Sequence, residues 1–345
     1  MMRIGIEHEF VFKDNSGNYL DFNNAEYLLF QEIVDLFPRF ENDDTVFDCK
    51  SLEHTPKRCY VEGFERYDAR GKLIETIPKG LEIRTLPYTT VDAVIKDFTS
   101  SYTQVMQIAK NFGFSPLLTS YHPYKTSVIF KKPLNQMEIV LRTDGERDIA
   151  MNAMLWHGLH VNVSMSDLSK EQLIDLIQKV NYYVPYMIPF SFSSPFYKGE
   201  EFEGLSYRTY RRSKTRKVIQ IQNRKGINVL EFRGFDACGD AKLLKSLLLF
   251  FKGLLLDKTL RKRAVSQDAE CMKQSALKGF EDEMIKEEGL LVLQAAKAAL
   301  KEEGDVLEGL EMMLHTNDSY AARMKQSYRE TDDIMESISN RYNYN

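Results

Sequence analysis

Two short segments with charged residues at alternate positions constrain this chain most, and they lie far apart in the sequence. The first reads GIEHEF and contains Glu7 and Glu9; the second reads NVLEFR and contains Glu231 and Arg233. Alternate side chains of a strand point to one face, so Glu7 and Glu9 would lie together, as would Glu231 and Arg233. Carboxylates on the inner face of a sheet are costly to bury unless a positive charge meets them. A divalent cation would meet that need, so the pattern indicates metal binding.

The composition allows one large domain or two small ones with a sizeable core, since 43% of the 345 residues are hydrophobic. The net charge is only -4, so no global field favours nucleic acid or an anionic membrane. The longest apolar stretch, residues 243–256, is interrupted by Lys245 and Lys252 and is too short to span a bilayer. The cysteines form no CxxC pair and no signal peptide is evident, which predicts reduced thiols in a cytoplasmic protein.

The hydrophobic spacing predicts an α+β chain built from antiparallel hairpins. Strands are expected at residues 2–13, 58–67, 73–77, 81–86, 156–165, 218–222 and 228–234. Helices are expected at residues 24–37, 89–111 and 169–186. Thr89 and Asp92 have the spacing of a capping box, and Gly113 would end that helix. From Ala241 onward the pattern is helical only, which predicts a mixed domain over residues 1–240 and a helical section over residues 241–345 packed on it.

Further candidate residues occur in other strands and in one basic segment. Glu75 and Glu82 are expected on neighbouring strands separated by a Pro-Lys-Gly turn, and His160 has apolar neighbours in GLHVNV. Residues 208–217 hold six basic residues in ten. Such a run is usually a solvated loop, although Tyr207 and Tyr210 would also suit stacking on RNA bases. The sequence has no GxGxxG or GxxxxGK[ST] loop, which argues against the nucleotide-binding folds built on those motifs.

Five motifs in order resemble a known family: GIEHEF, the acidic strand pair ending in LEIRT, GLHVNV, FSFSSPF followed by GLSYR, and LEFR followed by Asp236. They resemble the carboxylate–amine ligases related to bacterial and plant-type glutamate–cysteine ligase. The resemblance runs from Ile4 to about Asp236, about two thirds of the chain. It implies the catalytic fold of glutamine synthetase and the guanido kinases. That fold is a curved antiparallel sheet funnel with flanking helices, here over residues 1–240.

The resemblance also implies roles for individual residues. Arg233 would contact the nucleotide phosphates together with His160, and Arg208 would bind a substrate carboxylate or phosphate. Arg233 and Arg208 are thus the expected catalytic residues. The expected metal ligands are Glu7, Glu9, Glu75, Glu82, His160 and Glu231. The implied cofactors are ATP and Mg²⁺, with Mn²⁺ as an alternative, and Mg²⁺ prefers the oxygen ligands that these acids supply.

The implied activity is an ATP-dependent ligase that joins a carboxylate, glutamate or a related amino acid, to an amine through an acyl phosphate. Its partners would be small molecules, without nucleic acid or membrane. The Met and Leu pattern of the last hundred residues fits internal packing or a subunit interface, which leaves a homo-oligomer open. Two alternatives stay open: a guanido kinase-like phosphotransferase, and a non-catalytic protein that binds ATP or RNA.

The chain departs from the family pattern at three places. EHE stands where EEE is common, but His8 would point to the opposite face from Glu7 and Glu9. Asn162 stands where a second histidine is common. The loop at residues 199–204, expected near the amino-acid substrate, is rich in acids, so the pairing of glutamate with cysteine does not follow from the motifs.

Overall fold

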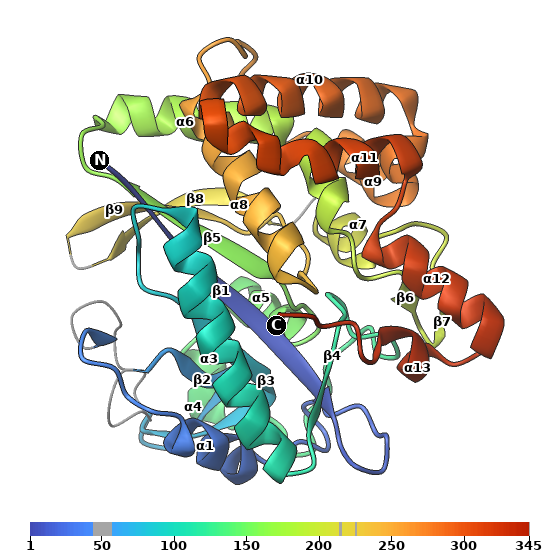
Figure 1. The fold of residues 1–345 in the computed structure, drawn as a ribbon. Coiled ribbons are helices and arrows are strands. Elements are labelled where there is room, and N and C mark those ends of the chain that lie inside the picture. Colours follow the sequence, from blue (N-terminus) through green and yellow to red (C-terminus); the bar gives the residue numbers. More distant parts are fainter. Residues whose placement is uncertain (44–56, 214–215, 225, 345) are drawn as a thin grey trace.

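An antiparallel sheet forms the centre of the molecule in the computed structural model, which describes residues 1–43, 57–213, 216–224 and 226–344 (Figure 1). The strand order is β2-β3-β1-β5-β9-β8, and β4 pairs with the C-terminal end of β1. All of these neighbours are antiparallel. The strands are β1 (Met2–Lys13), β2 (Cys59–Tyr67), β3 (Leu73–Arg84), β4 (Ser115–Leu117), β5 (Leu159–Met165), β8 (Ile219–Arg224) and β9 (Ile227–Phe232), with a separate hairpin of β6 (Phe196–Tyr197) and β7 (Glu200–Glu201).

Helices cover the sheet, and the mixed architecture agrees with the predicted α+β class. Helices α3 and α8 lie against one face of the sheet (Figure 1). Helix α10 packs against both α8 and α6, on the side of α8 that faces away from the sheet. The helices are α1 (Tyr27–Leu36), α3 (Val91–Asn111), α4 (Gln136–Val140), α5 (Asp144–Ala153), α6 (Lys170–Met187), α7 (Tyr207–Arg212), α8 (Ala241–Leu256), α9 (Ala269–Lys278), α10 (Glu283–Leu300), α11 (Glu308–Thr316), α12 (Tyr320–Thr331) and α13 (Ile334–Ile338). None of the described helices is long and apolar enough to cross a membrane.

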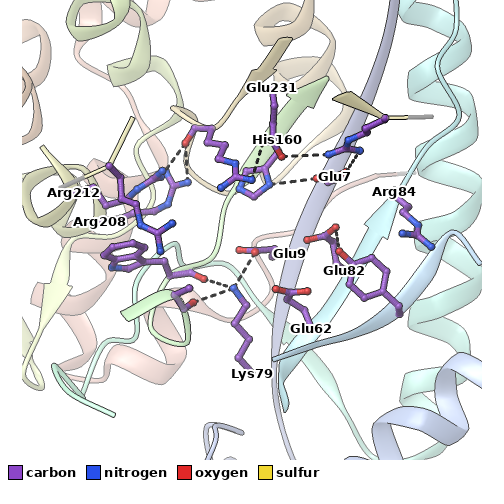
Figure 2. Close-up of a pocket in the computed structure, with 16 residues that line it drawn as sticks. Glu7, Glu9, Glu62, Lys79, Glu82, Arg84, His160, Arg208, Arg212 and Glu231 are labelled. Atoms are coloured by element: carbon purple, nitrogen blue, oxygen red, sulfur yellow. Dashed lines mark hydrogen bonds and ion pairs between the residues drawn. The ribbon is translucent and has the colours of Figure 1, made fainter. Parts of the chain in front are cut away.

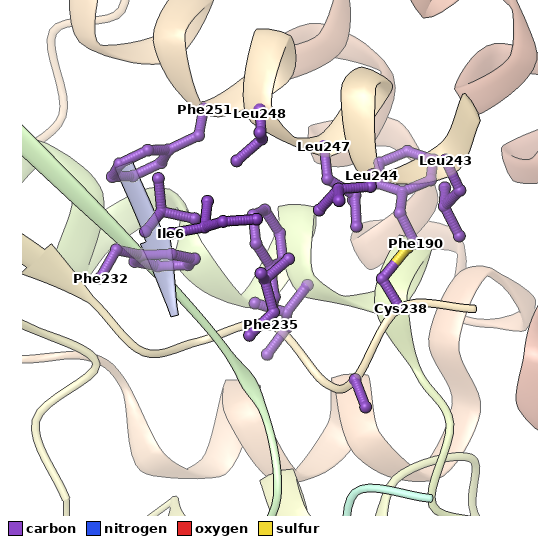
Figure 3. Close-up of a cluster of buried hydrophobic side chains, with 14 of the residues drawn as sticks. Ile6, Phe190, Phe232, Phe235, Cys238, Leu243, Leu244, Leu247, Leu248 and Phe251 are labelled. Carbon is purple, nitrogen blue, oxygen red and sulfur yellow. The ribbon is translucent and has the colours of Figure 1, made fainter. Parts of the chain in front are cut away.

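In the central strands, successive side chains point to opposite faces of the sheet. One face, the dry face, is apolar and buried, and the other face is polar. On β1, Ile6 and Phe10 are fully buried in the core, whereas the acids between them point the other way. Figure 3 shows Ile6 and Phe232 against the leucines of α8. The ring of Phe232 stacks on Phe251 of α8, with centroids 4.6 Å apart. His8 also lies on this dry face, 5.6 Å from the ring of Phe98 on α3, as its place between Glu7 and Glu9 predicted.

The predicted strands at residues 73–77 and 81–86 are one continuous strand, β3, so the prediction of two strands joined by a turn is wrong. The Pro-Lys-Gly segment forms a β-bulge, because the pairing of β3 with β2 shifts between Glu62 and Gly63 and leaves Lys79 unpaired. Gly80 has a φ of +158°, and a Cβ there would lie 1.9 Å from the carbonyl oxygen of Phe10. The close approach of β1 therefore requires glycine at this position.

Other differences from the prediction are local. The N-cap of α3 is Thr90, whose side chain accepts from the Ala93 amide, and not Thr89. Gly113 follows the helix with a φ of +77°, as predicted. The sequence patterns did not predict α4, α5 or α7. Between the strands predicted at residues 218–222 and 228–234, Arg224 still belongs to β8, and Lys225 lies outside the described residues.

The C-terminal helices share one hydrophobic core with the sheet. The tail contacts the segment between β9 and α8: Asn343 bridges Asp240, and the Tyr344 hydroxyl donates to the carbonyl of Cys238 at 2.6 Å. A division at residue 240 therefore marks a change in secondary structure within a continuous core, and as a domain boundary it stays a prediction. The described cysteines are free thiols, and Cys49 lies outside the described residues.

Candidate active site

A cavity of about 400 Å³ opens on the face of the sheet that α3 and α8 leave uncovered. Strands β1, β2, β3, β5, β8 and β9 all contribute side chains to its wall. This face of the sheet is therefore concave. Figure 2 shows acidic side chains from the strands on one side of the cavity and arginines of α7 on another.

The first acidic cluster contains Glu7, His160 and Glu231. In the strand register, Glu7 on β1 lies opposite His160 on β5, and Glu231 on β9 lies opposite Asn162, the next position on the same face of β5. The potential ligand atoms of the three residues lie within 4.8 Å of one another. Antiparallel pairing thus brings together three predicted metal ligands that are distant in sequence.

Neighbouring donors and positive charges keep both carboxylates of this cluster ionised. Glu7 lies 2.7 Å from Arg224, and Glu231 lies 2.7 Å from Arg233. Burial alone would raise the pKa of Glu7, but the contact with His160 and the charge of Arg224 outweigh it, so the pKa is lowered. Burial opposes ionisation of Glu231 too, yet Arg233 lowers the pKa of that carboxyl. Both groups are therefore anionic at neutral pH.

The second acidic cluster contains Glu9, Glu62 and Glu82, again with potential ligand atoms within 4.8 Å of one another. Glu9 on β1 pairs with Glu82 on β3, which places their side chains on the same face. Glu9 accepts hydrogen bonds from the Lys79 ammonium and the Gly158 amide, both at 2.9 Å. The bulge therefore has a direct effect on the site, since it presents Lys79 to a pocket acid.

Glu62 was not predicted, and Glu75, which was predicted, does not line the cavity. Glu75 precedes Glu82 by seven positions on the same strand, which corresponds to about 23 Å at ~3.3 Å per residue. In the strand register, Glu75 lies opposite Arg66 on β2. Two neighbouring strands would have brought Glu75 and Glu82 together, and one continuous strand separates them. Glu62 lies two positions from Tyr60 on β2, and Tyr60 lies opposite Glu82 in the strand register. Alternation along β2 is thus the sequence signal that points to Glu62.

Arginines from the basic segment form the opposite wall. Arg208 and Arg212 are buried on α7 and lie four residues apart, so both face the cavity. Arg212 and Arg216 lie over the ring of Trp156, at 5.5 and 5.1 Å from its centroid. The expectation of a solvated loop is therefore wrong for these arginines, and Lys214 and Thr215 lie outside the described residues.

Arg208 is held by a network that accounts for the serine-rich motifs. Its Nη1 lies 3.2 Å from Asp236, and its Nη2 donates to the carbonyl of Arg233 at 3.0 Å. Asp236 in turn accepts from the hydroxyls of Ser194 and Ser206, at 3.0 and 2.9 Å. FSFSSPF and GLSYR thus build the support for Arg208 and, through it, for the backbone of Arg233.

The residues present fit metal ions and a polyphosphate. Five carboxylates and one imidazole supply mainly hard oxygen ligands, the set that Mg²⁺ or Mn²⁺ prefers. The Nε atoms of Arg208 and Arg212 across the cavity, and that of Arg233 beside Glu231, are enclosed without a hydrogen-bond acceptor among the described residues. Among the described residues, Arg212 and Arg216 donate to backbone carbonyls and pair with no carboxylate, so an anion in the cavity would balance their charge. The arrangement can therefore hold metal ions on one side of a phosphate chain and guanidinium groups on the other.

Comparison with known sequences gives a family match over most of the chain. The sequence model of glutamate–cysteine ligase family 2 matches residues 3–227. A protein of Ruegeria pomeroyi that carries the provisional name glutamate–cysteine ligase 2 is 29% identical over 132 residues. That alignment covers 37% of this chain and 32% of the relative, so the match spans about a third of the relative's length.

Solved structures with a similar fold are also ligases. A bifunctional glutathione synthetase from Pasteurella multocida superposes with a TM-score of 0.64 at 12% identity, over 98% of this chain and 51% of that one. A glutamate–cysteine ligase from Francisella tularensis, solved with AMP, gives a TM-score of 0.56 at 14% identity, over 98% and 87%. At such identities the likeness establishes the fold, which agrees with the fold that the motifs implied.

Proposed function

The chain belongs to glutamate–cysteine ligase family 2, and on that premise we propose that it is an ATP- and Mg²⁺-dependent ligase. The proposed reaction joins the carboxyl group of a small molecule, glutamate or a related amino acid, to an amine. ATP and the two small molecules are substrates, and Mn²⁺ is an alternative to Mg²⁺. We also propose a cytoplasmic location, because free thiols such as those of Cys59, Cys238 and Cys271 are typical of a reducing compartment.

The reaction proceeds in two displacements. In the first, a carboxylate oxygen attacks the γ-phosphorus of ATP, the bond to the β,γ-bridging oxygen breaks, and ADP leaves. In the second, the amine nitrogen attacks the carbonyl carbon of the acyl phosphate. The C–N bond forms, the C–O bond to phosphate breaks, and hydrogen phosphate leaves with the proton that the nitrogen loses. Neither step needs a nucleophile from the protein.

The two acidic clusters have parallel roles in this proposal. Glu7, His160 and Glu231 would hold one metal ion, and Glu9, Glu62 and Glu82 would hold another. Bound metal ions would supply positive charge that neutralises phosphate oxygens. Arg233, which is paired with Glu231 of the first cluster, would contact the transferred phosphoryl group. Arg208 would act as a positioning residue, because it already donates to the backbone of Arg233.

The observation that carries the proposal is the opposition of two acidic clusters and a wall of arginines within one cavity. The described residues do not favour RNA binding. Tyr207 and Arg208 are buried, so they do not form an exposed surface for RNA. A guanido kinase would be recognised by reversible phosphate exchange with arginine or creatine and would form no acyl phosphate.

The test is trapping with hydroxylamine, which intercepts acyl phosphates as hydroxamates. The protein would be incubated with ATP, Mg²⁺ and a panel of carboxylates, and glutamate and related amino acids are expected to give hydroxamate that depends on both ATP and metal. A panel that gives none, although the protein binds a non-hydrolysable ATP analogue, would contradict ligase activity.

A further inference from the structure

A second cavity of about 250 Å³ adjoins the candidate active site. The two cavities share the wall residues Glu62 and Ala153. The second cavity is bounded by α1, by β2 and β3, and by Arg142 in the connection between α4 and α5. One end therefore lies at an acidic cluster where the proposed chemistry occurs, and the other end lies toward α1 and Arg142, which do not line the first cavity.

The guanidinium of Arg142 has a fixed orientation, but no described carboxylate lies within hydrogen-bond distance of it. Its guanidinium lies over the rings of Phe64 and Tyr67, 4.7 and 5.5 Å from their centroids. Its Nη1 is enclosed and has no acceptor among the described residues. Its Nη2 lies 3.7 Å from a Glu65 oxygen, which is longer than a hydrogen bond. Stacking thus fixes the plane of a guanidinium that retains capacity for a carboxylate.

The remaining walls are mixed. Val61, Phe64 and Leu73 supply apolar surface, and Gln31, Thr76 and the carboxylate of Glu65 supply polar groups. Glu62 and Phe64 lie two positions apart on β2, about 7 Å at ~3.3 Å per residue. A ligand that reaches from the Glu62 end to Arg142 must therefore span several bonds, with an apolar portion between its two polar ends.

Resting on the function proposed above, we propose that this cavity is the acceptor subsite and takes a primary amine that carries a carboxylate several bonds from its nitrogen. The amine would lie at the Glu62 end, within reach of the acyl phosphate, and attack it as in the second displacement described above. The carboxylate would pair with Arg142. Arg142 is then a specificity-determining residue for the acceptor, and it plays no part in formation of the acyl phosphate.

The test compares amines that differ only in the carboxylate. The pairs are β-alanine with ethylamine, 4-aminobutyrate with propylamine, and 4-(aminomethyl)benzoate with benzylamine. Hydroxylamine, which has no carboxylate, gives the baseline for acyl phosphate formation. Each amine is tested both as a substrate and as an inhibitor of hydroxamate formation. The wild-type protein should favour the carboxylated member of at least one pair about tenfold to a hundredfold, the range for one charge-assisted pairing.

Two substitutions at one residue and a matched control make the result specific. Arg142→Gln should abolish the preference for the carboxylated amine and leave the hydroxylamine rate unchanged. Arg142→Lys keeps the charge but loses the planar fork, so it should retain part of the preference. Arg263→Gln removes an arginine that is paired with Asp175 away from both cavities and should change neither rate.

The outcomes separate this inference from the proposed function. Loss of the carboxylate preference in Arg142→Gln, with the hydroxylamine rate intact, supports the acceptor subsite. A wild-type protein that makes hydroxamate but shows no carboxylate preference in any pair, as substrate or as inhibitor, overturns it while ligase activity stands. A preference that survives Arg142→Gln also overturns it. Absence of hydroxamate altogether would instead contradict the proposed function.

Discussion

Glu62 differs from Glu75 in its position relative to the acidic cluster, although both belong to the same β2–β3 hairpin. The potential ligand atom of Glu62 lies within 4.8 Å of those of Glu9 and Glu82, whereas Glu75 lies far along β3. A carboxylate ligand contributes charge as well as an oxygen atom, so an isosteric amide is a poor substitute. The role of the hairpin in the site can therefore be tested with two variants of the same chemistry.

We predict that Glu62→Gln weakens Mg²⁺-dependent binding of an ATP analogue by about tenfold or more, because one anionic ligand is lost. Glu75→Gln should bind as the wild type does. Isothermal titration of the analogue at several Mg²⁺ concentrations measures both. Equal losses in the two variants, or a loss only in Glu75→Gln, would refute the assignment of Glu9, Glu62 and Glu82 to one metal site.

A separate prediction concerns Glu231 and Arg233, which are 2.7 Å apart. Glu231→Gln should weaken metal-dependent nucleotide binding. Arg233→Lys should leave that binding largely intact and lower turnover by roughly two to three orders of magnitude, the scale for one preorganised charge-stabilising donor. Hydroxamate rates and analogue affinities, measured side by side, separate the two effects. Wild-type turnover by Arg233→Lys at saturating Mg²⁺ and ATP would show that this strand end is not the phosphoryl site.

At the scale of elements, helix pairing decides which charges are buried. Helix α7 turns a basic run inward because positions four apart share a face. A second case joins α6 to the C-terminal end of α8: Lys179 is 1% exposed and lies 3.0 Å from Asp257. Asp257 also accepts from the Thr259 hydroxyl at 2.7 Å. Burial alone would raise the pKa of Asp257, but the Thr259 and other hydrogen bonds, including that of Lys179, lower it to about 2.

We predict that Asp257→Asn lowers the free energy of unfolding by about 2–4 kcal/mol at pH 7, because it leaves Lys179 buried without its anionic partner. The folded pKa of Asp257 lies below its unfolded value, so its contribution is complete above about pH 4–5 and is lost as the pH falls toward 2. The difference between wild type and variant should therefore be constant from pH 8 to 5 and shrink below pH 4.

Urea unfolding at a series of pH values measures this difference. Asp175→Asn is the control, because Asp175 is paired with Arg263 at an exposed site and should cost under about 1 kcal/mol. A difference for Asp257→Asn that grows as the pH falls below 4 would contradict the assignment, since it would place the stabilising charge on another group.

At the scale of the whole molecule, the C-terminal tail closes the core behind the site. Asn343 donates to the Gly239 carbonyl at 2.7 Å, and Tyr344 donates to that of Cys238. The Cys238 amide lies 3.0 Å from His8, which lies between two pocket acids on β1. Burial raises the pKa of the Cys238 thiol, which keeps it protonated and unreactive. The proposed division at residue 240 therefore crosses a segment that both parts of the chain hold in place.

We predict that removal of residues 340–345 exposes Cys238 to thiol reagents and lowers the melting temperature by several degrees. The reason is that the tail covers this thiol and bonds its backbone. Peptide mapping after alkylation identifies which cysteine reacts. Tyr344→Phe, which removes one hydroxyl, should cost only about 1 kcal/mol and leave Cys238 protected. A truncated chain whose Cys238 resists alkylation would show that the tail does not seal this part of the core.

The sequence by itself predicted the α+β class and the long amphipathic elements, because alternation and helical spacing are local properties of the chain. It also identified Glu7, Glu9, Glu82, His160 and Glu231, which the structure places around one cavity. Tertiary structure alone decided the rest. Whether Pro-Lys-Gly forms a turn or a bulge depends on the partner strands, and that choice selected Glu62 over Glu75. The orientation of Arg208 and Arg212, and the adjoining cavity with Arg142, likewise follow from packing between segments far apart in sequence. Strand register and helix docking are set by such long-range contacts, which no local pattern encodes.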